Sequence, residues 1–328
     1  MGATIPMNRR DCLKILGAAA GGVLVAGPSA GDGTRRESRS ARPSPGRVQS
    51  ALGLQLFTVR DLLQKDLEGT LSSVAALGYA EVEMFGFGGN AFIEDPLFGR
   101  TAVEMRRILD QHGLAVPCTQ ISDRIDDIGP IADVAHTLGI GHLIIAMPRE
   151  FLSITPKGPV VSEVKDASQI MHLAERLNGL GSICRTEGLG LGYHNHHMEF
   201  ARVGSARAYD LLLERTDPNL VRMELDVGWA KAGGVEPQDY LARYPGRFVS
   251  CHLKDFAPER PLPADLSGAP IPNMSRMVAP GDGVVDFVKV LAEMDRQHVE
   301  HGFVECDLPA DAMEVARRGI RYLEGLQY

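Results

Sequence analysis

From residue 51 onward, apolar runs of strand length alternate with longer stretches whose apolar positions recur at helical spacing. The eight runs are LGLQLFTV (52–59), AEVEMF (80–85), LAVPCTQ (114–120), HLIIAM (142–147), LGLGYH (189–194), LVRMELDV (220–227), FVSCHLK (248–254) and GFVEC (302–306). The helical stretches that follow them span 66–77, 98–112, 127–138, 164–187, 206–215, 237–243, 285–298 and 310–326. Glycine comes directly after four of these stretches, where its left-handed backbone conformation can close a helix. The pattern therefore predicts eight strand–helix units.

Eight such units in residues 51–328 predict an α/β protein of the (β/α)8 TIM-barrel class. The alternative is a doubly wound open sheet, which usually has a glycine-rich phosphate-binding loop after its first strand. The first run ends in LFTVRD and has no such loop, so we favour the barrel. In a barrel, side chains at the carboxyl ends of all the strands line one shared mouth.

The N-terminal residues 1–30 have the features of an export signal. Arg9 and Arg10 precede a weakly apolar stretch (15–26) that is too short to span a membrane and is followed by small residues. The pattern resembles a twin-arginine signal, although Cys12 stands where such signals usually have a large apolar residue. We therefore expect a periplasmic or extracellular protein without stable membrane insertion after cleavage. The alternatives are an uncleaved anchor and an ordinary basic N-terminus.

The segment 31–50 is rich in Gly, Ser, Arg and Pro, so we expect a disordered linker between the signal and a catalytic domain at 51–328. Five cysteines are present, and those beyond Cys12 are far apart and mostly within apolar runs. We expect these to be buried free thiols, with a disulfide as the less favoured alternative.

Composition narrows the possible partners. Hydrophobic residues make up 44% of the chain and charged residues 23%, as in ordinary globular proteins. Residues 1–50 contain eight basic and three acidic residues, a net +5, so the total of −8 leaves −13 for the rest of the chain. Nucleic acid requires a basic surface, and the acidic body therefore argues against it. A small neutral substrate or a bound cation suits this charge better.

Metal-ligand residue types occur at the ends of the last four predicted strands. Side chains from six strands are expected to converge at the mouth, namely Gln55, Glu83, His194, Asp226, His252 and Glu305. The last four offer two imidazoles and two carboxylates, which suit Mn²⁺, Zn²⁺, Co²⁺ or Fe²⁺, whereas Mg²⁺ prefers more oxygen ligands. We therefore predict one divalent metal ion bound by these four residues. Gln55 and Glu83 are candidate substrate contacts.

The loop after the fifth strand contains further polar candidates. Glu199 is equally an acid or base, an alternative ligand to His194, or a helix-capping acid. His196 is expected to contact substrate or support a ligand, whereas His197 is expected to be solvated. Glu224 shares a strand face with the aspartate two residues later, and we expect a structural carboxylate there.

Two residues near the sixth and seventh strands have two interpretations each. Lys254 either stabilises an oxyanion or pairs with Asp255 or Glu305. Trp229 is either an apolar wall of the substrate site or an ordinary core residue.

Seven segments resemble, in order and spacing, the sugar phosphate isomerase/epimerase family of xylose isomerase-like TIM barrels. They are LGLQLFTVRD, ALGYAEVE, YHNHHMEF, MELDVGW, CHLKD, PGDGVVDF and FVECD. The resemblance implies a metal-dependent barrel with ligands after the fifth to eighth strands, which are His194, Asp226, His252 and Glu305 by position. Many relatives have glutamate at the first of these positions. Many also have a histidine where this chain has Trp229, which argues against a multinuclear site.

The resemblance implies several activities: ketose epimerisation, aldose–ketose isomerisation, inosose dehydration, elimination from 3-keto-glycosides and apurinic endonuclease activity. The carbohydrate reactions share one problem, the removal of a proton from a carbon next to a carbonyl. A metal stabilises the resulting enediolate while a carboxylate or imidazole moves the proton. We expect Glu305 to be a ligand and a base, with Glu199 or His196 as the opposing acid or base and Lys254 in support.

Export favours an unphosphorylated sugar, keto-sugar or glycoside as substrate. Our main expectation is a metal-dependent isomerase or epimerase, and the alternative is a 3-keto-glycoside lyase or dehydratase using the same site. A non-catalytic sugar-binding barrel, or a partner of an oxidoreductase, is the alternative from another class. The acidic body, Trp229 and the export signal oppose endonuclease-type hydrolysis.

Overall fold

The computed structural model describes residues 48–89, 93–123, 127–155, 158–258 and 276–328. The expected signal at 1–30 and the expected linker, apart from 48–50, lie outside these residues. The first described element is the 3-10 helix η1 (Val48–Ala51). Its Gln49 side chain donates hydrogen bonds of 2.7 Å to the Leu323 carbonyl and 3.0 Å to the Leu326 carbonyl. The start of the barrel is therefore fastened to the end of the chain.

Eight parallel strands close into a barrel in the order β1-β14-β11-β10-β7-β4-β3-β2, which confirms the predicted fold class. The strands are β1 (Gly53–Gln55), β2 (Glu81–Phe87), β3 (Cys118–Ile121), β4 (His142–Ile145), β7 (Gly190–His194), β10 (Val221–Asp226), β11 (Phe248–Leu253) and β14 (His301–Val304). Pairing of β14 with β1 closes the circle, with Gly53 opposite Phe303. The first predicted strand was too long, because the Gln55 side chain accepts a hydrogen bond from the Phe57 amide and the chain turns into η2 (Leu56–Val59).

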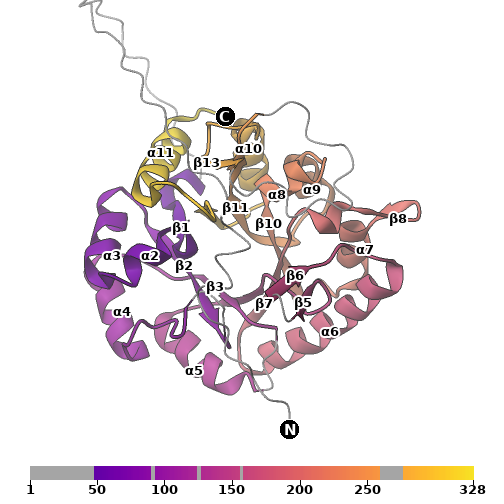
Figure 1. Cartoon of the computed structure of the whole chain (residues 1–328), viewed down its shortest axis with the longest axis horizontal. Helices are drawn as coiled ribbons and strands as arrows, with labels where there is room; N and C mark the ends of the chain where they lie inside the picture. The colour runs from indigo at the N-terminus through magenta and orange to yellow at the C-terminus, as the bar shows by residue number, and fades with distance from the viewer. Residues whose placement is uncertain (1–47, 90–92, 124–126, 156–157, 259–275) are drawn as a thin grey trace, which may run out of the picture.

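Helices surround the barrel (Figure 1). They are α2 (Arg60–Leu63), α3 (Leu67–Ala76), α4 (Ala102–Gln111), α5 (Gly129–Leu138), α6 (Ala167–Thr186), α7 (Ala208–Arg215), α8 (Val227–Ala232), α9 (Pro237–Arg243), α10 (Phe287–Arg296) and α11 (Ala312–Gly325). Several begin later than predicted, because the side chains of Thr101, Asp166 and Asp311 cap α4, α6 and α11. Among the described helices, none is both long and apolar enough to cross a membrane.

Three small hairpins interrupt the strand–helix alternation, and the sequence pattern did not predict them. They are β5 (Leu152–Thr155) with β6 (Gly158–Val161), β8 (Arg202–Val203) with β9 (Ala206–Arg207), and β12 (Asp255–Phe256) with β13 (Met277–Val278). They follow β4, β7 and β11, so all three belong to the loops on the carboxyl side of the barrel, where binding sites of this fold lie.

The barrel has two apolar layers. The large core lies between strands and helices, and a separate cluster of Cys118, Ile144, Val249 and Phe303 comes from four barrel strands, as expected of side chains that fill the interior. Phe303 packs so closely on Gly53 that a β-carbon there would lie 2.4 Å from its ring. The four cysteines in the described residues are buried and free, as expected.

Asp255 fastens the loop that follows β11. One carboxylate oxygen accepts hydrogen bonds from the amides of Phe256, Val284 and Val285, and the other from Gly281 and Gly283, all between 2.9 and 3.1 Å. The side chain is fully buried. Because both oxygens act only as acceptors, an amide cannot replace the carboxylate without turning an NH2 group toward amide donors.

Asp255→Asn should therefore destabilise the fold by about 3 kcal/mol, the value of two or so hydrogen bonds to a charged group. Denaturant unfolding of the variant measures this loss. The matched control is Asp282→Asn, whose carboxylate makes an exposed ion pair with Arg318 and should change the stability by about 1 kcal/mol or less. Equal stabilities of the two variants would contradict the anchoring role.

Candidate active site

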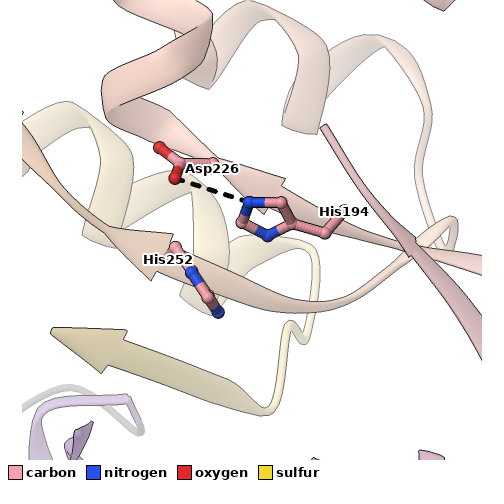
Figure 2. Close-up of side chains that lie close together, drawn as sticks. All are labelled: His194, Asp226 and His252. Atoms are coloured by element: carbon pink, nitrogen blue, oxygen red, sulfur yellow. Dashed lines mark ion pairs between the residues drawn. The ribbon is translucent and has the colours of Figure 1, made fainter. Parts of the chain in front are cut away.

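Side chains from three neighbouring strands meet at the carboxyl end of the barrel (Figure 2). His194 ends β7, Asp226 ends β10 and His252 lies near the end of β11, and one ligand atom of each lies within 4.8 Å of the others. His194 Nε2 is 3.7 Å from Asp226 Oδ2. Strand pairing fixes this arrangement, because Asp226 lies opposite His252 across β10 and β11. The predicted convergence of these residues is confirmed.

Asp226 is held in one orientation by the backbone around it. Its Oδ1 caps α8 by accepting a hydrogen bond from the Trp229 amide at 2.8 Å. Its own amide donates to the Asn195 side-chain oxygen at 3.1 Å. The capping bond directs the second carboxylate oxygen, Oδ2, toward His194 and the mouth.

The predicted fourth ligand, Glu305, joins this group through its Oε2, which lies 2.6 Å from His252 Nδ1 and 2.9 Å from Lys254 Nζ. Burial alone would raise the pKa of Glu305, but Lys254 and His252 hold it well below its ordinary value. Glu305 is therefore a carboxylate, the form that binds a cation. Its Oε2 is held at the centre of the cluster by His252 and Lys254, so the site supports the ligand role of Glu305 better than its expected role as base.

Lys254 is a buried ammonium surrounded by three carboxylates. Its Nζ lies 3.0 Å from Asp226 Oδ2, 2.9 Å from Glu305 Oε2 and 2.9 Å from Asp307 Oδ1. Burial alone would lower the pKa of Lys254, but these carboxylates raise it well above its ordinary value. The expected pairing with Glu305 is confirmed, whereas pairing with Asp255 is wrong because that carboxylate binds backbone amides. Sequence reasoning did not assign Asp307 a role, although it lies two residues after Glu305, just beyond β14.

A second polar layer lies beneath the mouth. His252 Nε2 is 2.7 Å from Glu83 Oε2 and 3.0 Å from Glu224 Oε1, and Gln55 Nε2 donates to Glu83 Oε2 at 2.5 Å. Burial and the charge of Glu224 raise the pKa of Glu83 well above its ordinary value. The side chains of Gln55 and Glu83 are fully buried. They thus support His252 from below, and their expected contact with substrate stays a prediction.

Trp229 forms one side of the site. Its ring centroid is 5.3 Å from Lys254 Nζ, 5.8 Å from the ring of His196 and 5.3 Å from that of His197. On its other side it packs on Phe256, so it is both a wall and a core residue. His197 is half-buried against this ring rather than fully solvated, and this burial lowers its pKa to about 4.

His196 lies beside the ligand cluster, with its ring centroid 5.1 Å from that of His194. Burial, followed by the nearby His194 and Lys254, lowers its pKa well below the ordinary value, so the ring is neutral at pH 7. Its Nδ1 has no hydrogen-bond partner among the residues that the structure describes. A neutral imidazole with an unpartnered nitrogen beside the mouth agrees with the expected role in contacting substrate.

Glu199 contacts its own loop and strand rather than the cluster of predicted metal ligands. Its Oε1 accepts a 2.6 Å hydrogen bond from the Tyr193 hydroxyl, and its Oε2 accepts one of 2.9 Å from the His196 amide. The carboxyl is fully buried, and burial raises its pKa to about 7. Glu199 thus fixes the loop that carries His196, and none of the three roles left open by the sequence is tested by these contacts.

Comparison with known proteins agrees with this architecture. Residues 71–326 match the model of the xylose isomerase-like TIM barrel family. An inosose dehydratase of Geobacillus kaustophilus is 29% identical over 247 residues, which are 68% of this chain and 74% of that protein. A sugar phosphate isomerase/epimerase from Parabacteroides distasonis shares 21% identity with a TM-score of 0.67, over 88% of this chain and 96% of the other. An IolI protein with a bound zinc atom shares 15% identity with a TM-score of 0.59, over 83% and 96%.

The fold is thus a closed parallel (β/α)8 barrel with a buried cluster of histidines and carboxylates at the carboxyl ends of its strands. This chain belongs to the xylose isomerase-like TIM barrel family. The family expected from the sequence is confirmed.

The buried Glu199 should make stability depend on pH. Between the ordinary value of 4.5 and its folded pKa of about 7, the folded chain keeps a proton that the unfolded chain releases, so stability falls as the pH rises. From pH 5 to pH 8 this costs roughly 2 to 3 kcal/mol, at 1.36 kcal/mol per pKa unit. Glu199→Gln should remove that share of the slope.

The measurement is the free energy of unfolding in urea at both pH values, for the wild type and Glu199→Gln. A wild type that loses no more stability than the variant would show that Glu199 is ionised throughout this range.

Proposed function

We propose that this protein is a metal-dependent lyase that dehydrates or cleaves an unphosphorylated keto-sugar or keto-glycoside after removing a proton next to the carbonyl. The observation that carries the proposal is the buried cluster of His194, Asp226, His252 and Glu305 at the barrel mouth. The inosose dehydratase named above favours elimination. Isomerisation or epimerisation, our first expectation, shares the proton-removal step and remains the competing outcome.

The donor set fits one divalent transition metal. Two imidazoles and two carboxylates suit Mn²⁺, Zn²⁺, Co²⁺ or Fe²⁺ better than Mg²⁺, and the zinc bound by IolI supports a metal in this family. Asp226 Oδ1 caps a helix, so Oδ2, which also contacts Lys254, is the oxygen that would bind the metal. When bound by these four residues, the metal supplies the positive charge that stabilises an enediolate.

His196 and Lys254, at the edge of the cluster, act in the proton-transfer step. Neutral His196, with its unpartnered Nδ1, takes the proton from the carbon next to the carbonyl. The electron pair of that C–H bond first moves toward the carbonyl oxygen and gives the enediolate. The new carbon–carbon double bond then forms as the carbonyl is restored and the C–O bond on the next carbon breaks. The proton is returned to the departing oxygen, which leaves as water or an alcohol. Lys254 keeps its proton and stabilises negative charge on that oxygen.

Charge and location support the choice of substrate. Asp226, Glu305 and Asp307 make the mouth acidic, which disfavours a phosphate dianion and suits a neutral sugar. We also propose that the twin-arginine pattern around Arg9 and Arg10 directs export of the chain. In the compartment outside the cytoplasm, free sugars and glycosides are the available substrates.

The reaction type can be tested by incubating the full chain, loaded with Mn²⁺ or Zn²⁺, with inososes and 3-keto-glycosides in deuterated water. We expect an unsaturated ketone with loss of water or alcohol, detected by its ultraviolet absorbance and by mass. Deuterium incorporation into an intact substrate would instead show isomerase or epimerase chemistry. Absence of both reactions across the panel, with metal bound, would contradict the proposal.

Asp226→Ala should abolish turnover and metal retention, because it removes a ligand and the carboxylate that orients Lys254. A folded barrel, judged by circular dichroism, is expected to remain.

His196→Gln should keep the metal and lose about 100-fold or more in turnover, the usual value of a general base. Full activity of either variant would refute its assigned role.

A further inference from the structure

Glu224 lies directly beneath the proposed metal site and contacts two of its ligands. It is fully buried on β10, two residues before Asp226 and on the same strand face. Its Oε1 lies 3.1 Å from His194 Nδ1 and 3.0 Å from His252 Nε2. A single carboxylate oxygen therefore faces one ring nitrogen of each histidine.

The second oxygen of Glu224 is also occupied. Its Oε2 accepts a 2.7 Å hydrogen bond from the Ser250 hydroxyl. Strand pairing sets the position of the residue, because Glu224 lies opposite His194 on β7 and opposite Ser250 on β11. The carboxylate is thus fixed by the barrel itself and by the serine, and its Oε1 stays directed at the two histidines.

This contact determines which nitrogen of each ring is available. An ionised carboxylate only accepts hydrogen bonds, so the nitrogen that faces it carries the hydrogen. The opposite nitrogens face the mouth. His194 Nε2 lies 3.7 Å from Asp226 Oδ2, too far for a hydrogen bond, so it is the nitrogen without hydrogen. His252 Nδ1 lies 2.6 Å from Glu305 Oε2, so both of its nitrogens carry hydrogen in the metal-free chain, and a metal bound beside Glu305 would take the place of the hydrogen on Nδ1. A metal binds the nitrogen without hydrogen, and the partner of the other nitrogen sets the tautomer.

We infer that Glu224 is a positioning residue that sets both histidines to bind the metal, His194 through Nε2 and His252 through Nδ1. The inference rests on the proposed metal-dependent function. It also accounts for the histidine at position 194, where the family resemblance leads one to expect glutamate. A glutamate ligand has no tautomers. A histidine ligand has two, and it needs a hydrogen-bond acceptor for its second nitrogen, which Glu224 provides.

The two histidines differ in how far they depend on Glu224. His252 Nε2 has a second acceptor in Glu83 Oε2 at 2.7 Å. His194 Nδ1, by contrast, has Glu224 as its one polar partner among the residues that the structure describes. Loss of the carboxylate should therefore disturb His194 more than His252.

The direct test is ¹⁵N magnetic resonance of the zinc-loaded full chain labelled at histidine, with His194 and His252 assigned by substitution. We expect His194 with hydrogen on Nδ1 and zinc on Nε2, and His252 with hydrogen on Nε2 and zinc on Nδ1. The same nitrogen bound to zinc in both rings would overturn the inference.

Variants separate positioning from other roles of the carboxylate. Glu224→Met, which cannot accept a hydrogen bond, should weaken Zn²⁺ binding about 10- to 100-fold, the usual effect of losing such a partner, and should mix the tautomers of His194. Glu224→Gln keeps an oxygen that can face both rings, so it should retain the tautomers and most of the affinity. Ser250→Ala leaves Glu224 Oε1 in place, so it should lower the Zn²⁺ affinity about threefold or less.

Zinc affinity of Glu224→Met equal to that of the wild type would show a packing role only. A loss as large in Glu224→Gln as in Glu224→Met would show that the charge, or direct ligation, matters instead. If Glu224→Met does not fold, the wild-type spectra and the Gln variant still decide. If the wild type binds no metal, the proposed function fails, while the tautomer of His194 in the metal-free chain still tests Glu224: hydrogen on Nε2 there would overturn its role.

Discussion

The constraint on which this structure depends is the burial of charge at the carboxyl end of the barrel. Glu224, Asp226, Glu305 and Asp307 are buried there with Lys254 and His252 as the nearby cations. Burial raises the pKa of Asp307 to about 6, so at neutral pH four carboxylates outnumber two cations. Unbalanced charge in a low-dielectric interior is costly. A divalent cation that took the place of the His252 proton would reduce this excess of negative charge.

Strand alternation turns this cluster into two layers. The ends of three strands and the residues just after them each supply two side chains that are two residues apart. They are Glu224 and Asp226 at the end of β10, His252 and Lys254 at the end of β11, and Glu305 and Asp307 just beyond β14. The deeper layer orients the histidines, and the upper layer surrounds Lys254. Phe303 lies beneath, with its ring centroid 6.2 Å from that of His252. The polar cluster thus rests on an apolar floor, which keeps water from below and strengthens its electrostatic interactions.

The sequence predicted the barrel and the meeting of His194, Asp226, His252 and Glu305 because both follow from periodicity. Alternation of strand and helix specifies the topology, and the topology brings strand ends together. What periodicity does not contain is the direction of a side chain within a loop. Glu199 turned toward the Tyr193 hydroxyl and a backbone amide rather than the mouth. The contact of Asp307 with Lys254 likewise joins residues far apart in sequence.

The central claim is that the mouth of the barrel binds one divalent metal ion through the four predicted residues. Elemental analysis of the purified full chain, beside His252→Ala, tests it most directly. The account predicts about one equivalent of a transition metal in the wild type, since the site has four donor residues, and loss of that metal in the variant. Wild-type protein that binds no metal even after reconstitution, or a variant that keeps a full equivalent, would contradict it.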